Sequence, residues 1–270
     1  MRHEGGDGYT LRVTPVALTI AGSDPSGGAG LQADLKTFLR FGVYGEAVVT
    51  LITVQNTRVV SRMEVLSPEL VRDQIEAVMG DIPPGAAKTG ALGNRAVVEA
   101  IADLAADFTF PLVVDPVFLS TGGTPLLDEA GRAAMAKRLL PRAFLLTPNL
   151  EEAALLVGFP VEDLASMRNA AEVIASLGAR NVLIKGGHLK SEAVDILLLH
   201  NGKVVEFYAA RLTTRNTHGT GCSYAAAITA ELAKGTQLEE AVGRAKRFIT
   251  QAIRQAPGLG GGMGPLNHAV

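Results

Sequence analysis

Two glycine-rich segments have the composition of loops that bring backbone close to a ligand. The first, AGSDPSGGAG (residues 21–30), follows an apolar run and precedes a helical pattern. Glycine has no Cβ, so such a loop predicts a ligand site, with a plain flexible connection as the alternative. Gly28-x-Gly30-x-x-Ala33 also matches a dinucleotide-binding turn. In that turn, however, the first glycine directly follows the strand, whereas Pro25 intervenes here.

The second segment, NTHGTGC (residues 216–222), leads into a helical stretch. Gly219 and Gly221 let successive N–H groups point into one concavity, and a helix start at Thr220 adds unpaired donors and a positive dipole end. This pattern predicts an anion hole for a transferring phosphoryl group. Cys222 falls in the first turn, where a thiol pKa can drop below about 8.5 and the thiol can act as a base. The alternative is a threonine-capped helix with an inert, buried cysteine.

Polar residues follow three further predicted strands. Asn149 and Glu152, in TPNLEE, are three apart and can both reach a hydrated Mg²⁺; the alternative is a helix cap with acids complementing the dipole. Asp115, before Pro116, suits a metal or phosphate site or a turn cap. Lys185, followed by Gly186 and Gly187, suits a nucleotide phosphate or backbone contact.

The five histidines carry no metal site in our interpretation. His188 is expected to be a polar loop residue without a catalytic role. The other histidines, at positions 3, 200, 218 and 268, lack metal-ligand spacing.

The elements that must position these residues alternate between strands and helices. Strands are predicted at 16–21, 48–54, 112–114, 144–146 and 182–184, a hairpin at 196–199 and 204–207, and helices at 31–41, from Ser67-Pro68-Glu69, at 220–234 and at 238–256. Alternation predicts an α/β fold, a mostly parallel sheet with helices on both faces. In such sheets ligands bind beyond the carboxyl ends of the strands. We expect residues 1–12 to be a disordered lead-in and residues 13–270 to form a single domain.

The composition and motifs of the chain argue against several classes of protein. The 270 residues include 25 Lys and Arg against 27 Asp and Glu, a net charge of −2, which argues against a nucleic-acid surface. No apolar run is long enough for a membrane span, and no signal peptide is evident, so a cytoplasmic protein is expected. The single cysteine excludes an intrachain disulfide and a cysteine-rich zinc site. Neither a Walker P-loop nor a G-x-S-x-G elbow occurs.

Together, the motifs occur in the order found in one enzyme family. From about Val16 to His268, the segments AGSDPSGGAGLQADLKT, VQNT, KTGALG, DPV, TPNLEE, IKGGH, NTHGTGC and GPLNH resemble the hydroxymethylpyrimidine/phosphomethylpyrimidine kinases of thiamin synthesis, a branch of the ribokinase superfamily. The resemblance implies a ribokinase-like three-layer α/β/α sandwich that uses ATP and Mg²⁺, and a homodimer. It implies phosphorylation of 4-amino-5-hydroxymethyl-2-methylpyrimidine and then of its monophosphate.

The resemblance also implies roles for individual residues. Cys222 takes the base position, and the anion hole consists of Gly219, Thr220 and Gly221. The pyrimidine pocket is expected to be lined by Gly22, Asp34, Gln55 and Ala91. ATP and phosphate contacts are expected from Asp115, Asn149, Glu152, Lys185, Gly187 and Thr217, with Asp115 and Glu152 near Mg²⁺ through water.

Two departures from the family pattern concern the acceptor. Ala91 stands where many members have methionine, which is expected to widen the pocket. Residues 118–123, FLSTGG, lack a lysine expected there, which bears on the second phosphorylation. Pyridoxal kinases of the same branch are therefore the alternative. A non-catalytic metabolite-binding protein and a dinucleotide-dependent oxidoreductase are the alternatives from other classes. The glycine-rich residues 258–265 are either a mobile tail or ordered near the active site.

Overall fold

A computed structural model describes residues 14–187, 189 and 193–270, so the predicted lead-in at 1–12 and His188 lie outside the described residues. The described strands form one nine-stranded sheet in the order β3-β2-β1-β4-β5-β6-β7-β8-β9. From β2 to β7 neighbouring strands are parallel, and β3, β8 and β9 pair antiparallel at the two edges. The strands are β1 (Val16–Ser23), β2 (Tyr44–Gln55), β3 (Val60–Val65), β4 (Ala86–Thr89), β5 (Leu112–Val114), β6 (Leu145–Leu146), β7 (Val182–Ile184), β8 (Ala193–Leu198) and β9 (Val204–Ala209).

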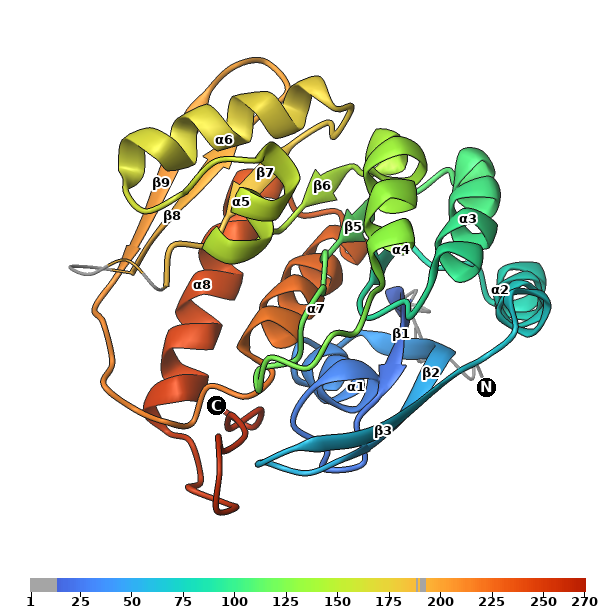
Figure 1. The fold of residues 1–270 in the computed structure, drawn as a ribbon, viewed down its shortest axis with the longest axis horizontal. Helices are drawn as coiled ribbons and strands as arrows, with labels where there is room; N and C mark the ends of the chain where they lie inside the picture. Colours follow the sequence, from blue (N-terminus) through green and yellow to red (C-terminus); the bar gives the residue numbers. More distant parts are fainter. Residues whose placement is uncertain (1–13, 188, 190–192) are drawn as a thin grey trace, which may run out of the picture.

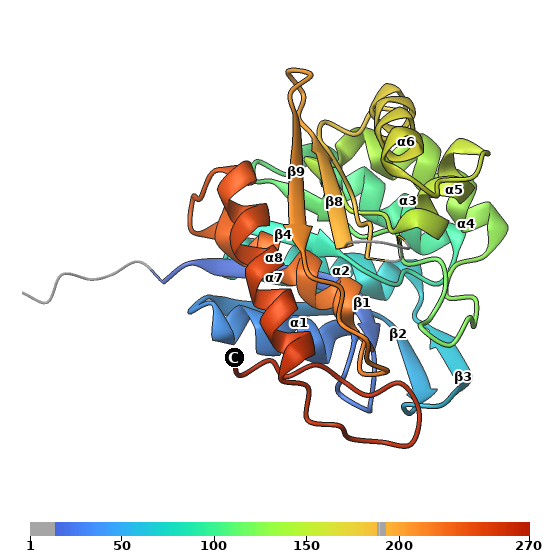
Figure 2. The same ribbon diagram turned by 90° about the vertical axis from the view of Figure 1, so that its left-hand side faces the viewer.

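Helices cover both faces of this sheet, as Figures 1 and 2 show, which confirms the predicted three-layer α/β/α architecture. One apolar core joins the sheet to α2 through α6, and two others join it to α1, α7 and α8. The helices are α1 (Gly30–Arg40), α2 (Pro68–Asp81), α3 (Arg95–Leu104), α4 (Glu129–Ala134), α5 (Leu150–Val157), α6 (Leu164–Ser176), α7 (Thr220–Ala233) and α8 (Leu238–Arg254).

The predicted elements lie within a few residues of the observed ones. Ser67 caps α2 through a hydrogen bond from Leu70 N, and Pro68 opens the helix, as its sequence indicates. The sequence analysis missed β3 and β4. The short β4 contains two alanines and a fully buried lysine, and β3 is an edge strand with exposed polar residues, so neither has the apolar pattern of a core strand.

Within the described ranges, the helices include none that is both long enough and apolar enough to cross a membrane.

Candidate active site

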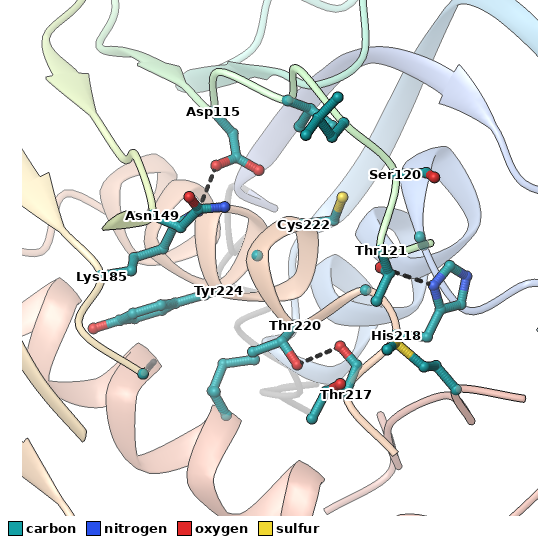
Figure 3. A pocket seen from close by; sticks show the side chains of 18 of the residues that line it. Asp115, Ser120, Thr121, Asn149, Lys185, Thr217, His218, Thr220, Cys222 and Tyr224 are labelled. Carbon is teal, nitrogen blue, oxygen red and sulfur yellow. Dashed lines mark hydrogen bonds and ion pairs between the residues drawn. The ribbon is translucent and has the colours of Figure 1, made fainter. Parts of the chain in front are cut away.

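A cavity of about 590 Å³ lies beyond the carboxyl ends of the parallel strands. Figure 3 shows its polar side chains converging from the strand-end loops and from the start of α7. Thirteen of the fourteen predicted site residues line the cavity; Asp34 does not. They are Gly22, Gln55, Ala91, Asp115, Asn149, Glu152, Lys185, Gly187, Thr217, Gly219, Thr220, Gly221 and Cys222.

The two glycine-rich segments pack directly against each other at this cavity. Gly219 has φ +79°, and a Cβ there would overlap the carbonyl oxygen of Gly28. A Cβ on Gly28 would lie 2.5 Å from the His218 ring, and one on Gly30 would overlap the carbonyl oxygen of Gly22. Close approach of backbone therefore requires glycine at 219 and 30, and the His218 ring requires it at 28. Neither a flexible connection nor ligand contact is needed to explain these glycines.

Helix α7 begins at the cavity with Gly219 as its N-cap, and in the described structure no side chain caps it. Thr220 instead donates from its hydroxyl to Thr217 O at 2.7 Å, so the predicted alternative of a threonine cap is wrong. Ser223 N donates the first helical hydrogen bond of α7, to Gly219 O. The N–H groups of Gly221 and Cys222 come before it, in the first turn of the helix. An anion in the cavity can use these donors together with the positive end of the helix dipole.

Charged side chains face the start of α7. Lys185 Nζ donates to Asp115 Oδ1 at 2.7 Å, and Thr147 Oγ1 donates to the same oxygen at 2.9 Å. A Cβ on Gly221 would lie 3.2 Å from Lys185 Nζ and 3.7 Å from Asp115 Oδ2. Any larger residue at 221 would therefore intrude between the helix terminus and this ion pair.

Asn149 and Glu152 form the capping box of α5, which confirms the structural alternative for this pair. Asn149 N donates to Glu152 Oε2, and Glu152 N donates to Asn149 Oδ1, both at 2.8 Å. Both residues nevertheless line the cavity. Burial raises the pKa of Glu152 to about 7; the Lys185 ammonium lowers it in part and the Asp115 carboxylate raises it further.

Asp115 and Glu152 are the carboxylates predicted to lie near a metal ion, and both line the cavity, as do Asp24, Glu151 and Asp195. The described residues contain no cluster of three His, Cys, Asp or Glu side chains that could hold a metal directly. Two carboxylates are compatible with Mg²⁺, which prefers oxygen ligands and keeps several of its waters. The donor set therefore fits an ion bound mainly through water.

The predicted low pKa of the Cys222 thiol is wrong. Burial raises the pKa to about 12: Lys88 lowers it, but the carboxylates of Asp34 and Asp115 raise it. Loss of water around the sulfur outweighs the Lys88 charge and the hydrogen bond from the Gly30 backbone, which both lower the pKa. At neutral pH Cys222 is a protonated thiol, although it lines the cavity.

Asp34 lies beneath the site and does not contact the pyrimidine pocket, contrary to prediction. Its side chain is fully buried, and its Oδ2 accepts from Thr19 Oγ1 at 2.6 Å and from Lys88 Nζ at 2.7 Å. Burial alone lowers the pKa of Lys88, but the Asp34 carboxylate and then Cys222 and Asp115 raise it above its usual value. Helix α1 thus directs Asp34 toward β1 and β4, where it neutralises a buried lysine.

His218 is the site residue that the sequence analysis missed. It is 4% exposed, and its Nε2 lies 2.8 Å from Asp24 Oδ2 and 3.3 Å from the Gln55 side-chain amide. With Nε2–H donated to the carboxylate, Nδ1 accepts from Thr121 Oγ1 at 3.2 Å. His218 thereby connects both glycine-rich segments to the 118–123 loop. Its place inside NTHGTGC was the available signal, but metal spacing was the only role tested.

The glycine-rich C-terminal segment is ordered beside the site, which decides between the two predicted alternatives. His218 N donates to Gly264 O at 3.1 Å, and Met263 N donates to Thr57 O at 2.9 Å. Met263 also lines the cavity. The segment therefore joins the β2–β3 turn to the second glycine-rich segment.

Comparison of the chain with known proteins finds a matching family model and similar sequences. The family model for phosphomethylpyrimidine kinase matches residues 24–267. A hydroxymethylpyrimidine/phosphomethylpyrimidine kinase of Rhizobium meliloti is 48% identical, over 95% of this chain and 97% of that protein. The thiamine biosynthesis bifunctional protein of Geobacter sulfurreducens is also 48% identical, over 94% of this chain, which spans about half of that protein (52%).

Solved structures share the fold closely. A Bacillus subtilis pyridoxal kinase in an ADP complex has a TM-score of 0.87 and 37% identity, covering 95% of this chain and 98% of that one. A phosphomethylpyrimidine kinase of Clostridium difficile has a TM-score of 0.78 and 42% identity, covering 88% and 99% respectively.

Replacing Gly219 by alanine is expected to disrupt the contact between the two glycine-rich segments. The matched control is Gly235→Ala, because Gly235 has φ +80° but no described atom near its missing Cβ. In the control, the unfolding free energy should fall only by the cost of placing alanine in the left-handed region, about 1–2 kcal/mol. Urea unfolding should show a larger loss of unfolding free energy for Gly219→Ala; equal losses in the two variants would contradict the close packing.

Breaking the buried ion pair of Lys88 with Asp34 should lower the unfolding free energy substantially. Lys88→Met leaves the Asp34 carboxylate unpaired and should lower the unfolding free energy by about 3–5 kcal/mol, with partial recovery in the Lys88→Met/Asp34→Asn variant. The exposed pair of Arg95 with Glu99 serves as the control, and Arg95→Met should cost at most about 0.5 kcal/mol. Denaturant titration of the four proteins measures these differences, and a single-variant loss as small as the control's would refute the pair's importance.

Because Cys222 is the only cysteine, its reactivity can be measured directly. A pKa of about 12 leaves a thiolate fraction roughly a thousandfold below that of a free thiol at neutral pH. Iodoacetamide labelling of the folded protein at pH 7.5 should therefore be at least that much slower than labelling of the urea-unfolded chain. Similar rates in the two states would show that the thiol pKa is not raised.

Proposed function

The chain belongs to the phosphomethylpyrimidine kinase family, and on this premise we propose that it transfers the γ-phosphoryl group of ATP to 4-amino-5-hydroxymethyl-2-methylpyrimidine and then to the resulting monophosphate. One observation carries the proposal. A single cavity brings the uncapped start of α7 and the ion pair of Lys185 with Asp115 together with Gly22, Gln55 and Ala91 of the predicted acceptor pocket. Phosphoryl transfer needs mainly positioning and charge stabilisation, which such an arrangement supplies.

On the donor side, the N–H groups of Gly221 and Cys222 are placed to bind the oxygens of the transferring group. Lys185 adds a positive charge beside Gly221, with its Nζ 3.2 Å from the position of a Cβ there. Mg²⁺, when bound through water by Asp115 and Glu152, would neutralise charge on the phosphates of ATP. Support for ATP as the donor comes from related pyridoxal kinases, one of Bacillus subtilis in complex with ADP and one of Staphylococcus aureus with AMP-PCP and pyridoxal.

On the acceptor side, Gly22, Gln55 and Ala91 provide a wall with little side-chain bulk. A Cβ on Gly22 would lie 2.5 Å from Leu51, so this position has no space for a side chain. The amide of Gln55 can both donate to a ring nitrogen and accept from an exocyclic amine, which suits an aminopyrimidine. We assign ring recognition to Gln55 and exclude Asp34 from it, because Asp34 is buried beneath the cavity.

Cys222 is assigned the role of orienting the acceptor hydroxyl by hydrogen bonding. As a neutral thiol it is a poor proton acceptor, and a loose phosphoryl-transfer transition state requires little early deprotonation. Its position at the start of α7 places it beside the proposed anion hole.

Substitution of Cys222 tests this assignment. Cys222→Ala should lower kcat by about tenfold to a hundredfold, with a much smaller change in KM for the pyrimidine, because the group acts mainly in the transition state. Cys222→Ser retains a hydroxyl donor and acceptor and should lose less. Steady-state kinetics with both substrates varied gives these constants; near wild-type turnover by Cys222→Ala would remove Cys222 from the mechanism.

A pyridoxal kinase is the second candidate, favoured by Ala91 at the position where methionine is expected. A coupled ATP-consumption assay with mass analysis of products should compare hydroxymethylpyrimidine, its monophosphate and pyridoxal. We expect turnover of both pyrimidines, and some turnover of pyridoxal that Ala91→Met reduces selectively by narrowing the pocket. Turnover of pyridoxal alone would replace the proposed function by the second candidate.

We further propose that the protein is a cytoplasmic homodimer, as the family resemblance implies. Strand β2 carries exposed apolar side chains that a partner copy would cover: Tyr44, Ile52 and Val54 are 50–56% exposed. Light scattering of the purified protein measures the oligomeric state.

A further inference from the structure

Behind the donor side of the cavity, one buried carboxylate connects three elements. Asp195, in β8, is 1% exposed, and its Oδ2 accepts from Lys246 Nζ of α8 at 2.6 Å and from Tyr224 OH of α7 at 3.0 Å. Burial and the nearby carboxylate raise the pKa of Tyr224 well above its usual value, so its hydroxyl remains a donor. All three side chains also line the cavity.

The other oxygen of Asp195 binds the segment that follows β7. Gly186 N donates to Asp195 Oδ1 at 2.9 Å. A Cβ on Gly186 would overlap the carbonyl oxygen of Val194, so this segment and β8 are in direct backbone contact. The hydrogen bond to a charged acceptor is stronger than one to a neutral group, so Asp195 fixes the position of Gly186 firmly.

Lys185 is the neighbour of this fixed residue. Its backbone N donates to Pro148 O at 2.8 Å, and its Nζ donates to Asp115 Oδ1. Tyr224 is four residues beyond Thr220, one helical turn from the start of α7. Asp195 is therefore bonded on one side to the segment that carries Lys185 and on the other to the first turns of the helix that supplies the anion-binding N–H groups.

We propose that Asp195, with its charge balanced by Lys246, is a positioning residue that sets the distance between the Lys185–Gly187 segment and the N-terminus of α7, and thereby the binding of the ATP phosphates. The proposal rests on the proposed function only in taking ATP as the phosphoryl donor. The ammonium of Lys246 offsets the cost of burying the carboxylate, and Tyr224 orients it. Loss of this positioning weakens binding of the ATP phosphates. It leaves the pyrimidine pocket, formed around Gln55 and Ala91, unchanged.

The test uses a neutral replacement of the pair. In Asp195→Asn/Lys246→Met the amide still accepts from Gly186 N, and no unpaired charge is left in the interior. We expect thermal unfolding near that of the wild type, a dissociation constant for a non-hydrolysable ATP analogue with Mg²⁺ raised about tenfold by calorimetry, and an unchanged KM for the pyrimidine. Wild-type affinity for the nucleotide in this variant would overturn the proposal. A rise in the KM for the pyrimidine equal to the rise in the dissociation constant for the nucleotide would also overturn it.

A double-mutant cycle with Lys185→Ala shows whether Asp195 acts through Lys185. If it does, the neutral pair added to Lys185→Ala should weaken nucleotide binding by less than threefold further. Fully additive losses would overturn the positioning role. Glu231→Gln is the control, because Glu231 is a buried carboxylate of α7 that accepts from Lys234 and Arg244 away from the cavity. It should leave nucleotide affinity unchanged.

The binding measurement separates this proposal from the proposed function. If the wild type binds the nucleotide but phosphorylates neither pyrimidine, the acceptor assignment fails and the role of Asp195 is still decided by calorimetry. If the wild type binds no nucleotide, the kinase function and this proposal fail together.

Discussion

The direct contact between the Gly28 carbonyl and the Gly219 backbone is the constraint on which the site depends. Two segments almost 200 residues apart in the chain meet there without intervening side chains, because any Cβ on Gly219 would overlap that carbonyl oxygen. The contact brings the start of α7 beside the loop that follows β1. His218 strengthens it by bonding to Asp24 across the same junction. The start of α7 and the residues Gly22, Gln55 and Ala91 consequently line one cavity.

Three lysines whose side chains have little exposed surface are each paired with a buried carboxylate. Lys88 is paired with Asp34, Lys185 with Asp115, and Lys246 with Asp195. The interior gives little solvation to a charge, so the pairing determines where charged groups can lie. The positive charge of Lys185 is thereby kept close to the uncapped terminus of α7. The same desolvation raises the pKa of the Cys222 thiol, whose charge has no dedicated partner.

The motifs predicted most of the site because the carboxyl ends of parallel strands meet at one edge of the sheet. Residues such as Asn149 and Glu152 could be placed at the cavity from their position after a strand alone. The two residues cap the helix and also line the cavity, so the capping role does not remove them from the candidate site. The placement of Asp34 in the pyrimidine pocket was wrong because the rotation of α1 about its axis decides which neighbour the side chain contacts. A loop-to-helix pattern in the sequence does not determine that rotation.

The sequence by itself determined the α/β architecture, the strand-end loops and the glycine positions, because hydrophobic periodicity and the absence of a Cβ are local properties. It also carried the family motifs from one end of the chain to the other. The tertiary structure alone decided which charges are buried together and hence the protonation of Cys222, since desolvation depends on neighbours distant in the chain. It likewise decided the links that His218 and Asp195 make between separate elements, because hydrogen-bond partners are selected by packing.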